Sequence, residues 1–160
     1  MVLEITVSAI ISFTFATIMV FTYSVFDLRT RKVPNQVMLA GALVGLVIVI
    51  LSGHIVEQAM LHLTAVLVTL VLGYILFRIG SFGGADVKAI FTIAIISPGI
   101  EFGSWGDPVL EAILVIGLLL VIALVSGYII SQRKTVGTEV VPLIPIIFTA
   151  YLVLQVLALL

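Results

Sequence analysis

The chain has 160 residues, of which 62% are hydrophobic and only 9% are charged, and its formal net charge is −1. Soluble domains carry about 25% charged residues, so this composition excludes an ordinary soluble protein and indicates one integral membrane domain, residues 1–160. The small net charge gives no sign of a nucleic-acid partner, and the absence of cysteine excludes disulfides, thiolate metal sites and a cysteine nucleophile.

Six apolar stretches are long enough, or nearly long enough, to cross a membrane. Helices are expected because backbone groups in lipid must be hydrogen-bonded within their own segment, and the chain lacks the short alternating segments of a barrel. The expected spans are residues 5–26, 36–51, 59–79, 87–100, 109–130 and 143–160. The second is short unless it extends toward residue 56, and the fourth is the shortest. The sequence therefore predicts an all-α integral membrane protein with six transmembrane helices.

The charged residues between these spans divide by sign. All seven basic residues fall on one side: Arg29, Arg31, Lys32, Arg78, Lys88, Arg133 and Lys134. The acids Glu4, Glu57, Glu101, Asp107 and Glu111 fall on the other side, and only Asp27, Asp86 and Glu139 share the basic one. By the positive-inside rule the basic side faces the cytoplasm and both termini lie outside, in the cytoplasmic membrane.

Asp27 stands at the end of the first expected span, just ahead of three basic residues. Taken alone, it could be a solvated acid paired with Arg29 or Arg31. Pro34 then prevents a continuous helix, and Asn35 could cap the helix that follows.

Asp86 stands at the start of the fourth expected span, in a glycine-rich turn that contains Gly80, Gly83 and Gly84. Taken alone, it could simply cap a helix N-terminus. Lys88 is expected to mark the membrane boundary, and tuning of the Asp86 charge is a second possibility. A carboxylate near the hydrocarbon boundary is costly and indicates a functional site.

Two such carboxylates on different spans, but on one side of the membrane, suggest acid–base chemistry. Two carboxyl groups in close approach do not both ionise easily, so one can activate a water while the other, protonated, polarises a carbonyl. This chemistry needs no metal and no cofactor. Because the glycines make the second turn pliant, we expect the ligand-free protein to hold the two carboxyl groups too far apart for a direct hydrogen bond, with closure on substrate.

The remaining polar residues point to structural roles. His54 and His62 lie toward the outer side and are too few for a convincing metal site. Trp105, in the loop of residues 97–108, is expected to anchor at the membrane interface. Pro142 and Pro145 open the last span and predict an irregular first turn.

Three segments resemble elements of the type IV prepilin peptidases and archaeal preflagellin peptidases. Residues 26–35, Phe-Asp-Leu-Arg-Thr-Arg-Lys-Val-Pro-Asn, resemble the first aspartate region of that family. Residues 83–89, Gly-Gly-Ala-Asp-Val-Lys-Ala, resemble its second, the GxGD region, and residues 142–145 resemble its late Pro-x-x-Pro element. Ala85 replaces the usual glycine before the aspartate, and the chain lacks the cysteine-rich loop and methyltransferase region of larger members.

The resemblance implies a membrane aspartic endopeptidase that cleaves the basic leader of prepilin- or preflagellin-like membrane proteins at the cytoplasmic face, without methyltransferase activity. Asp27 and Asp86 would be its catalytic residues. Residues that bind substrate or shape the loops would be Gly83, Gly84, Ala85, Lys88, Pro142 and Pro145. The alternatives are a small proton-coupled transporter or channel in which Asp27 and Asp86 form a proton relay, and a scaffold subunit that needs no acids at matched depth.

Overall fold

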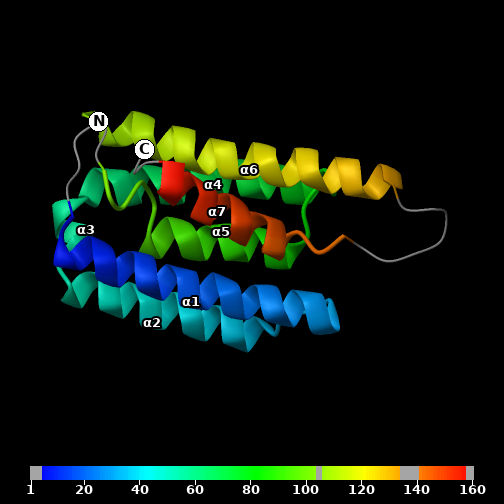
Figure 1. The fold of residues 1–160 in the computed structure, drawn as a ribbon, viewed down its shortest axis with the longest axis horizontal. Coiled ribbons are helices and arrows are strands. Elements are labelled where there is room, and N and C mark those ends of the chain that lie inside the picture. Colours follow the sequence, from blue (N-terminus) through cyan, green and yellow to red (C-terminus); the bar gives the residue numbers. More distant parts are fainter. Residues whose placement is uncertain (1–4, 104–105, 134–140, 158–160) are drawn as a thin grey trace.

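A computed structural model of the chain describes residues 5–103, 106–133 and 141–157. Within these ranges the protein is helical and contains no strand, as predicted. The helices are α1 Val7–Thr30, α2 Asn35–Leu51, α3 His54–Glu57, α4 Ala59–Arg78, α5 Gly84–Ile96, α6 Pro108–Arg133 and α7 Ile144–Leu157. Figure 1 shows the long helices running side by side as one bundle.

Three of these helices, α1, α4 and α6, are long and apolar enough to cross a membrane, while α2 and α7 are apolar but shorter. The second expected span does not extend toward residue 56, because Gly53 takes a left-handed conformation (φ 79°) and the four-residue helix α3 begins after it. Helix α5 has 13 residues, so it rises only about 20 Å. The six-span count and the orientation therefore stay predictions.

The short helix α5 occupies the middle of the bundle. It packs against α1, α2, α4, α6 and α7, and it lies between longer helices in Figure 1. Ala89, Ile90, Ile93 and Ala94 are fully buried along it. Because its neighbours surround it, α5 has no need to match the full thickness of about 30 Å of hydrocarbon by itself.

The outer surface of the bundle is apolar. Leu43 on α2, Leu67 on α4 and Leu118 on α6 are each about half exposed, along with many other large hydrophobic side chains. An apolar surface of this extent is rare on a soluble monomer. It is the surface that lipid chains require, and it supports the membrane location.

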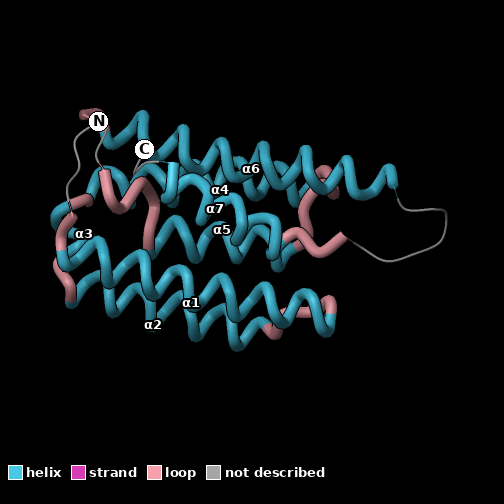
Figure 2. Tube along the Cα trace, in the orientation of Figure 1, coloured by secondary structure: helices cyan, strands magenta, loops and turns pink. Residues whose placement is uncertain are grey.

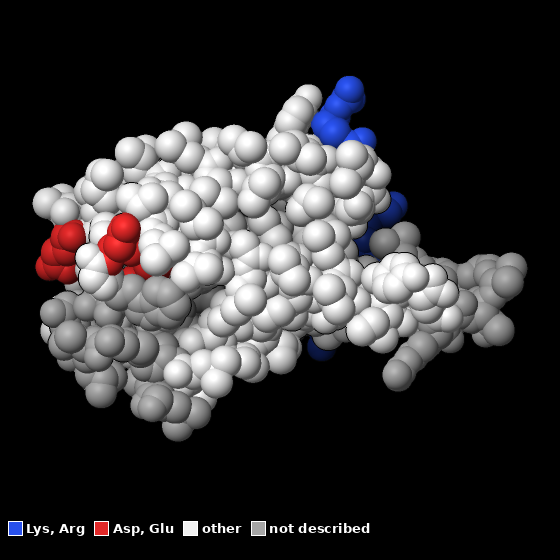
Figure 3. All heavy atoms as spheres, turned by 90° about the horizontal axis from the view of Figure 1, so that it is seen from above, with Lys and Arg blue, Asp and Glu red and all other residues white. Residues whose placement is uncertain are grey.

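Charged groups gather at the two ends of the bundle, as Figure 3 shows. We call the end with the connections 31–34, 79–83 and 141–143 the basic end. The end with the connections 52–53 and 97–107 is the acidic end. The described parts of these connections are drawn as loops toward the two ends of the bundle in Figure 2. The separation of charge expected from the sequence is therefore present along the bundle axis, although Glu4, Lys134 and Glu139 lie outside the described residues.

Candidate active site

Asp27 lies in the last turn of α1, at the basic end, and is only 9% exposed. Helix α1 ends at Thr30, and the next residue, Arg31, takes a left-handed conformation (φ 55°) and donates its backbone N–H to the Asp27 carbonyl oxygen. The Asp27 side chain accepts a hydrogen bond of 3.4 Å at Oδ2 from the backbone N–H of Ile144. Asp27 is therefore not a solvated surface acid, because the start of α7 covers it, although Arg31 lies near enough to interact with its charge.

Asp86 lies in the first turn of α5 at the same end and is half-buried. Its Oδ2 accepts a hydrogen bond of 2.9 Å from the backbone N–H of Gly83. Asp86 thus does cap its own helix, as one interpretation of the sequence allowed. The cap also fixes the direction of the carboxyl group, because the donor belongs to the glycine turn itself.

The two carboxyl groups lie near enough to interact electrostatically. Burial raises the pKa of Asp86 to about 6, the hydrogen bond from Gly83 opposes the rise, and the charge of Asp27 adds to it. In the described part of the chain no hydrogen bond joins the two carboxyl groups. Each carboxyl group instead accepts a hydrogen bond from a backbone N–H. The separation of the pair in the absence of substrate stays a prediction.

Lys88 connects the two aspartate regions. Its Nζ donates a hydrogen bond of 2.6 Å to Oδ1 of Asn35, the first residue of α2. The bond ties the start of α5 to the segment that follows Asp27 in the chain. The side chain therefore links the two loops, a role the sequence analysis did not consider.

The glycines of the second turn differ in what they contribute. Only Gly80 takes a left-handed conformation (φ 76°). A Cβ atom at Gly83 would lie 3.0 Å from Oδ2 of Asp86, whereas at Gly84 it would only make ordinary contact with Phe77 at 3.7 Å. Glycine is thus favoured at residue 80 by its backbone conformation, and a Cβ atom at residue 83 would press on the Asp86 carboxyl group. Ala85, half-buried, packs against the core.

A groove of about 760 Å³ opens beside Asp86. It is bounded by the glycine turn, the second half of α6, and Val141 and Leu143 ahead of α7. Its lining is mainly apolar, and Asp86 is the one acid among the described residues that line it. The sequence analysis missed the α6 wall, because Ala123, Gly127 and Tyr128 form part of an ordinary apolar span.

The proline element contributes to both the groove and the Asp27 environment. Pro142 precedes α7, and Pro145 lies in its first turn, where a missing N–H is tolerated. Leu143, between the prolines, reaches the groove and lies against Gly127 of α6. The irregular start of the last span therefore places Leu143 in the groove and the Ile144 N–H on Asp27.

The chain matches one protein family. The model of the type IV leader peptidase family aligns with residues 14–159. The match includes both aspartates, the glycine turn and the proline element. No curated protein and no solved structure matches the chain.

Proposed function

Because the chain belongs to the type IV leader peptidase family, we propose that it is a membrane-embedded aspartic endopeptidase with Asp27 and Asp86 as its catalytic pair. Its substrates are prepilin- or preflagellin-like membrane proteins, from which it removes a basic leader at the cytoplasmic face. The observation that carries the proposal is the placement of two carboxyl groups, one buried and one half-buried, at the same end of the bundle, in the last turn of α1 and the first turn of α5.

The groove beside Asp86 suits an apolar substrate segment. Its α6 wall runs from Ala123 to Ser131, along the direction of the bundle, and Asp86 stands at its edge. An apolar stem lying against α6 would bring the peptide bond at its cytoplasmic end to Asp86. The basic leader would then extend past the basic end, where Asp27, Asp86 and Glu139, the last outside the described residues, are the acids available to offset the local positive charge.

The raised pKa of Asp86 suggests how the pair divides its roles. With a pKa near 6, Asp86 holds a proton more readily than an ordinary aspartate. A substrate in the groove displaces water and strengthens this effect. We therefore assign the general acid to Asp86 and the general base to Asp27.

The reaction then runs in two steps. Asp27 takes a proton from water while the water oxygen attacks the scissile carbonyl carbon, and Asp86 donates its proton to the carbonyl oxygen. Collapse of the tetrahedral intermediate breaks the carbon–nitrogen bond while Asp27 donates its proton to the leaving amine and Asp86 takes back a proton from a hydroxyl group of the intermediate.

A proton-coupled transporter is the alternative from another class. It would place acids along a polar path through the middle of the membrane. Asp27 and Asp86 both lie at one end of the bundle, and the groove beside Asp86 is mainly apolar. These features favour the peptidase.

Reconstitution separates the two functions. The purified protein would be inserted into liposomes with a prepilin-like substrate that has a basic leader and an apolar stem, and the products mapped by mass spectrometry. We expect one cut at the junction of leader and stem, and no Asp86-dependent change in an internal pH-sensitive dye. Proton flux that depends on Asp86, without any cleavage, would instead establish the transporter.

A further inference from the structure

A buried tyrosine hydroxyl lies where three helices meet, deeper in the bundle than the aspartate pair. Tyr23 is fully buried in α1, four residues before Asp27. Its hydroxyl donates a hydrogen bond of 3.2 Å to the carbonyl oxygen of Met38 in α2. It also interacts with the side chain of Thr92 in α5. One side chain therefore connects the helix that carries Asp27 with α2 and with the helix that carries Asp86.

The fit of α2 against the Tyr23 hydroxyl depends on a glycine. A Cβ atom at Gly41 would collide with the Tyr23 hydroxyl oxygen and would lie 2.8 Å from the Met19 sulfur. The glycine therefore leaves the space that the hydroxyl occupies, and α2 can approach α1 closely. Phenylalanine would fill nearly the same volume, whereas a buried hydroxyl costs free energy unless it is hydrogen-bonded. The polar atom of Tyr23 thus has a role that packing alone does not explain.

The contacts of Tyr23 belong to a closed set of polar contacts, which we call the polar circuit. Thr92 donates from Oγ1 to the Lys88 carbonyl oxygen at 2.9 Å, and the Lys88 side chain donates to Asn35. Asn35 and Met38 lie three residues apart in the first turn of α2, so the contacts return to the helix that Tyr23 binds. The polar circuit of Tyr23, Met38, Asn35, Lys88 and Thr92 therefore joins α1, α2 and α5.

The polar circuit lies close to both aspartates along the helices. Tyr23 precedes Asp27 by four residues, and Thr92 follows Asp86 by six. These separations correspond to a rise of about 6 Å and about 9 Å, less than two helical turns each. Helix α1 ends at the basic end and α5 begins there, so both hydroxyl groups lie on the inner side of the aspartate pair. A shift of α1 against α5 at this level would move the two carboxyl groups relative to each other.

We propose, building on the proposed function, that Tyr23 is a positioning residue of the peptidase. Its hydroxyl fixes α1 against α2 and α5, and so sets the placement of the Asp27 carboxyl group relative to that of Asp86. The groove beside Asp86 is bounded by the glycine turn, α5, α6 and the segment ahead of α7, and no described residue of α1 or α2 lines it. Tyr23 therefore affects the chemical step much more than the binding of an apolar substrate segment.

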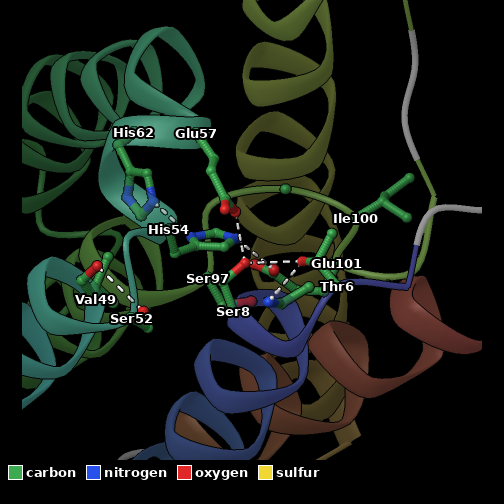
Figure 4. A network of polar contacts seen from close by, with 12 residues as sticks. Thr6, Ser8, Val49, Ser52, His54, Glu57, His62, Ser97, Ile100 and Glu101 are labelled. Atoms are coloured by element: carbon green, nitrogen blue, oxygen red, sulfur yellow. Dashed lines mark hydrogen bonds and ion pairs between the residues drawn. The ribbon is translucent and has the colours of Figure 1, made fainter.

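The kinetic test removes the hydroxyl group and keeps the aromatic ring. Tyr23→Phe should lower kcat for leader cleavage about 10-fold, because a small displacement of reacting groups is costly, and should leave KM nearly unchanged. The matched control is Tyr151→Phe. Tyr151 is also fully buried, and its hydroxyl lies 2.6 Å from Oγ of Ser97 at the acidic end, in the region that Figure 4 shows. The control also loses a buried hydrogen bond, but it should keep the wild-type kcat.

A double variant tests whether Tyr23 acts through the polar circuit. Thr92→Val removes the hydroxyl group of α5 and keeps a β-branched side chain, and it should also lower kcat. If both hydroxyl groups serve one circuit, the double variant Tyr23→Phe/Thr92→Val should have a kcat no lower than that of the more impaired single variant. A wild-type kcat in Thr92→Val, or single effects on kcat that multiply in the double variant, would exclude the polar circuit as the route.

A measurement of geometry separates the role of Tyr23 from the peptidase activity itself. The chain has no cysteine, so nitroxide labels on Arg29→Cys and Ser81→Cys report on the end of α1 and on the turn before α5. In dipolar electron paramagnetic resonance, Tyr23→Phe should shift or broaden the distance distribution between the labels, and Tyr151→Phe should not.

The outcomes distinguish the two proposals. If the wild type cleaves no leader and the distance distribution still changes in Tyr23→Phe alone, the peptidase proposal fails and the positioning of the two aspartates stands. An unchanged distance distribution in Tyr23→Phe would overturn the positioning role. So would a wild-type kcat in Tyr23→Phe, or an equal loss of kcat in Tyr23→Phe and Tyr151→Phe.

Discussion

Asp86→Asn is predicted to make the protein more stable at pH 8 while removing its activity. The folded state holds the pKa of Asp86 at about 6, above the ordinary 3.8, chiefly because the carboxyl group is buried. A group whose folded pKa is raised binds its proton more tightly in the folded state, so stability is greatest below about pH 4 and falls as the pH rises to about 6. Above that pH the charged carboxylate carries a constant penalty, which asparagine does not have.

The size of the penalty follows from the same pKa. The difference between about 6 and 3.8 corresponds to about 3 kcal/mol at 1.36 kcal/mol per pKa unit. Asp86 is half-buried, so solvent screening reduces the expected gain to about 1–2 kcal/mol. The Asn side chain can still accept the hydrogen bond from the Gly83 N–H through its Oδ1 atom, so the helix cap is kept.

The assay is unfolding by SDS in mixed micelles, followed by far-ultraviolet circular dichroism at pH 8 and at pH 4.5. The free energy of unfolding of the variant should exceed that of the wild type at pH 8. The difference should shrink at pH 4.5, where the wild-type Asp86 carboxyl group is protonated. A wild type that is more stable than Asp86→Asn at pH 8, or a difference that does not change with pH, would refute the reasoning.

Three further predictions concern activity and topology. The kcat/KM of the free enzyme should decline as the pH rises above about 6, because Asp86 loses the proton it donates; a flat profile from pH 6 to pH 9 would contradict that role. Gly83→Ala should lower kcat about 10-fold, because the new Cβ displaces the Asp86 carboxyl, whereas the control Gly84→Ala should leave it nearly unchanged; equal effects would exclude this steric account. Single cysteines at Ser81 and Gln58 should be labelled by a membrane-impermeant reagent from the cytoplasm and from outside, respectively; labelling of both from one side would contradict the orientation.

Much of the fold could be predicted from hydropathy and charge. Long apolar runs predict helices in lipid. The sign of the charges in each connection predicts which end of the bundle that connection belongs to. The end of α2 at Leu51 agrees with the expected span of residues 36–51, and the Ser-Gly dipeptide that follows is a turn signal. The four-residue helix α3 was not predicted. The length of α5 has a tertiary cause: the surrounding helices shield it from lipid.

The candidate site was predictable only in part. Asp27 and Asp86 were placed on the same side because each flanks a recognisable span. The Ile144 N–H that reaches Asp27 comes from 117 residues farther along the chain, so only the fold brings it there. On the α6 wall of the groove, Tyr128 and Ser131 are the polar residues, and neither forms a pattern that indicates a site. His54 and His62, expected to be structural, lie within hydrogen-bond distance of each other, and His54 also contacts the buried carboxyl group of Glu101.

The most direct test of the catalytic pair is leader cleavage by Asp27→Asn and Asp86→Asn in liposomes, with Asp107→Asn as the control at the acidic end. Neither catalytic role survives the loss of an ionisable carboxyl group. We predict that both catalytic-pair variants insert and fold yet give no detectable cleavage product, while the control cleaves at the wild-type rate. Near-normal turnover by Asp27→Asn or by Asp86→Asn would contradict the assignment of the pair.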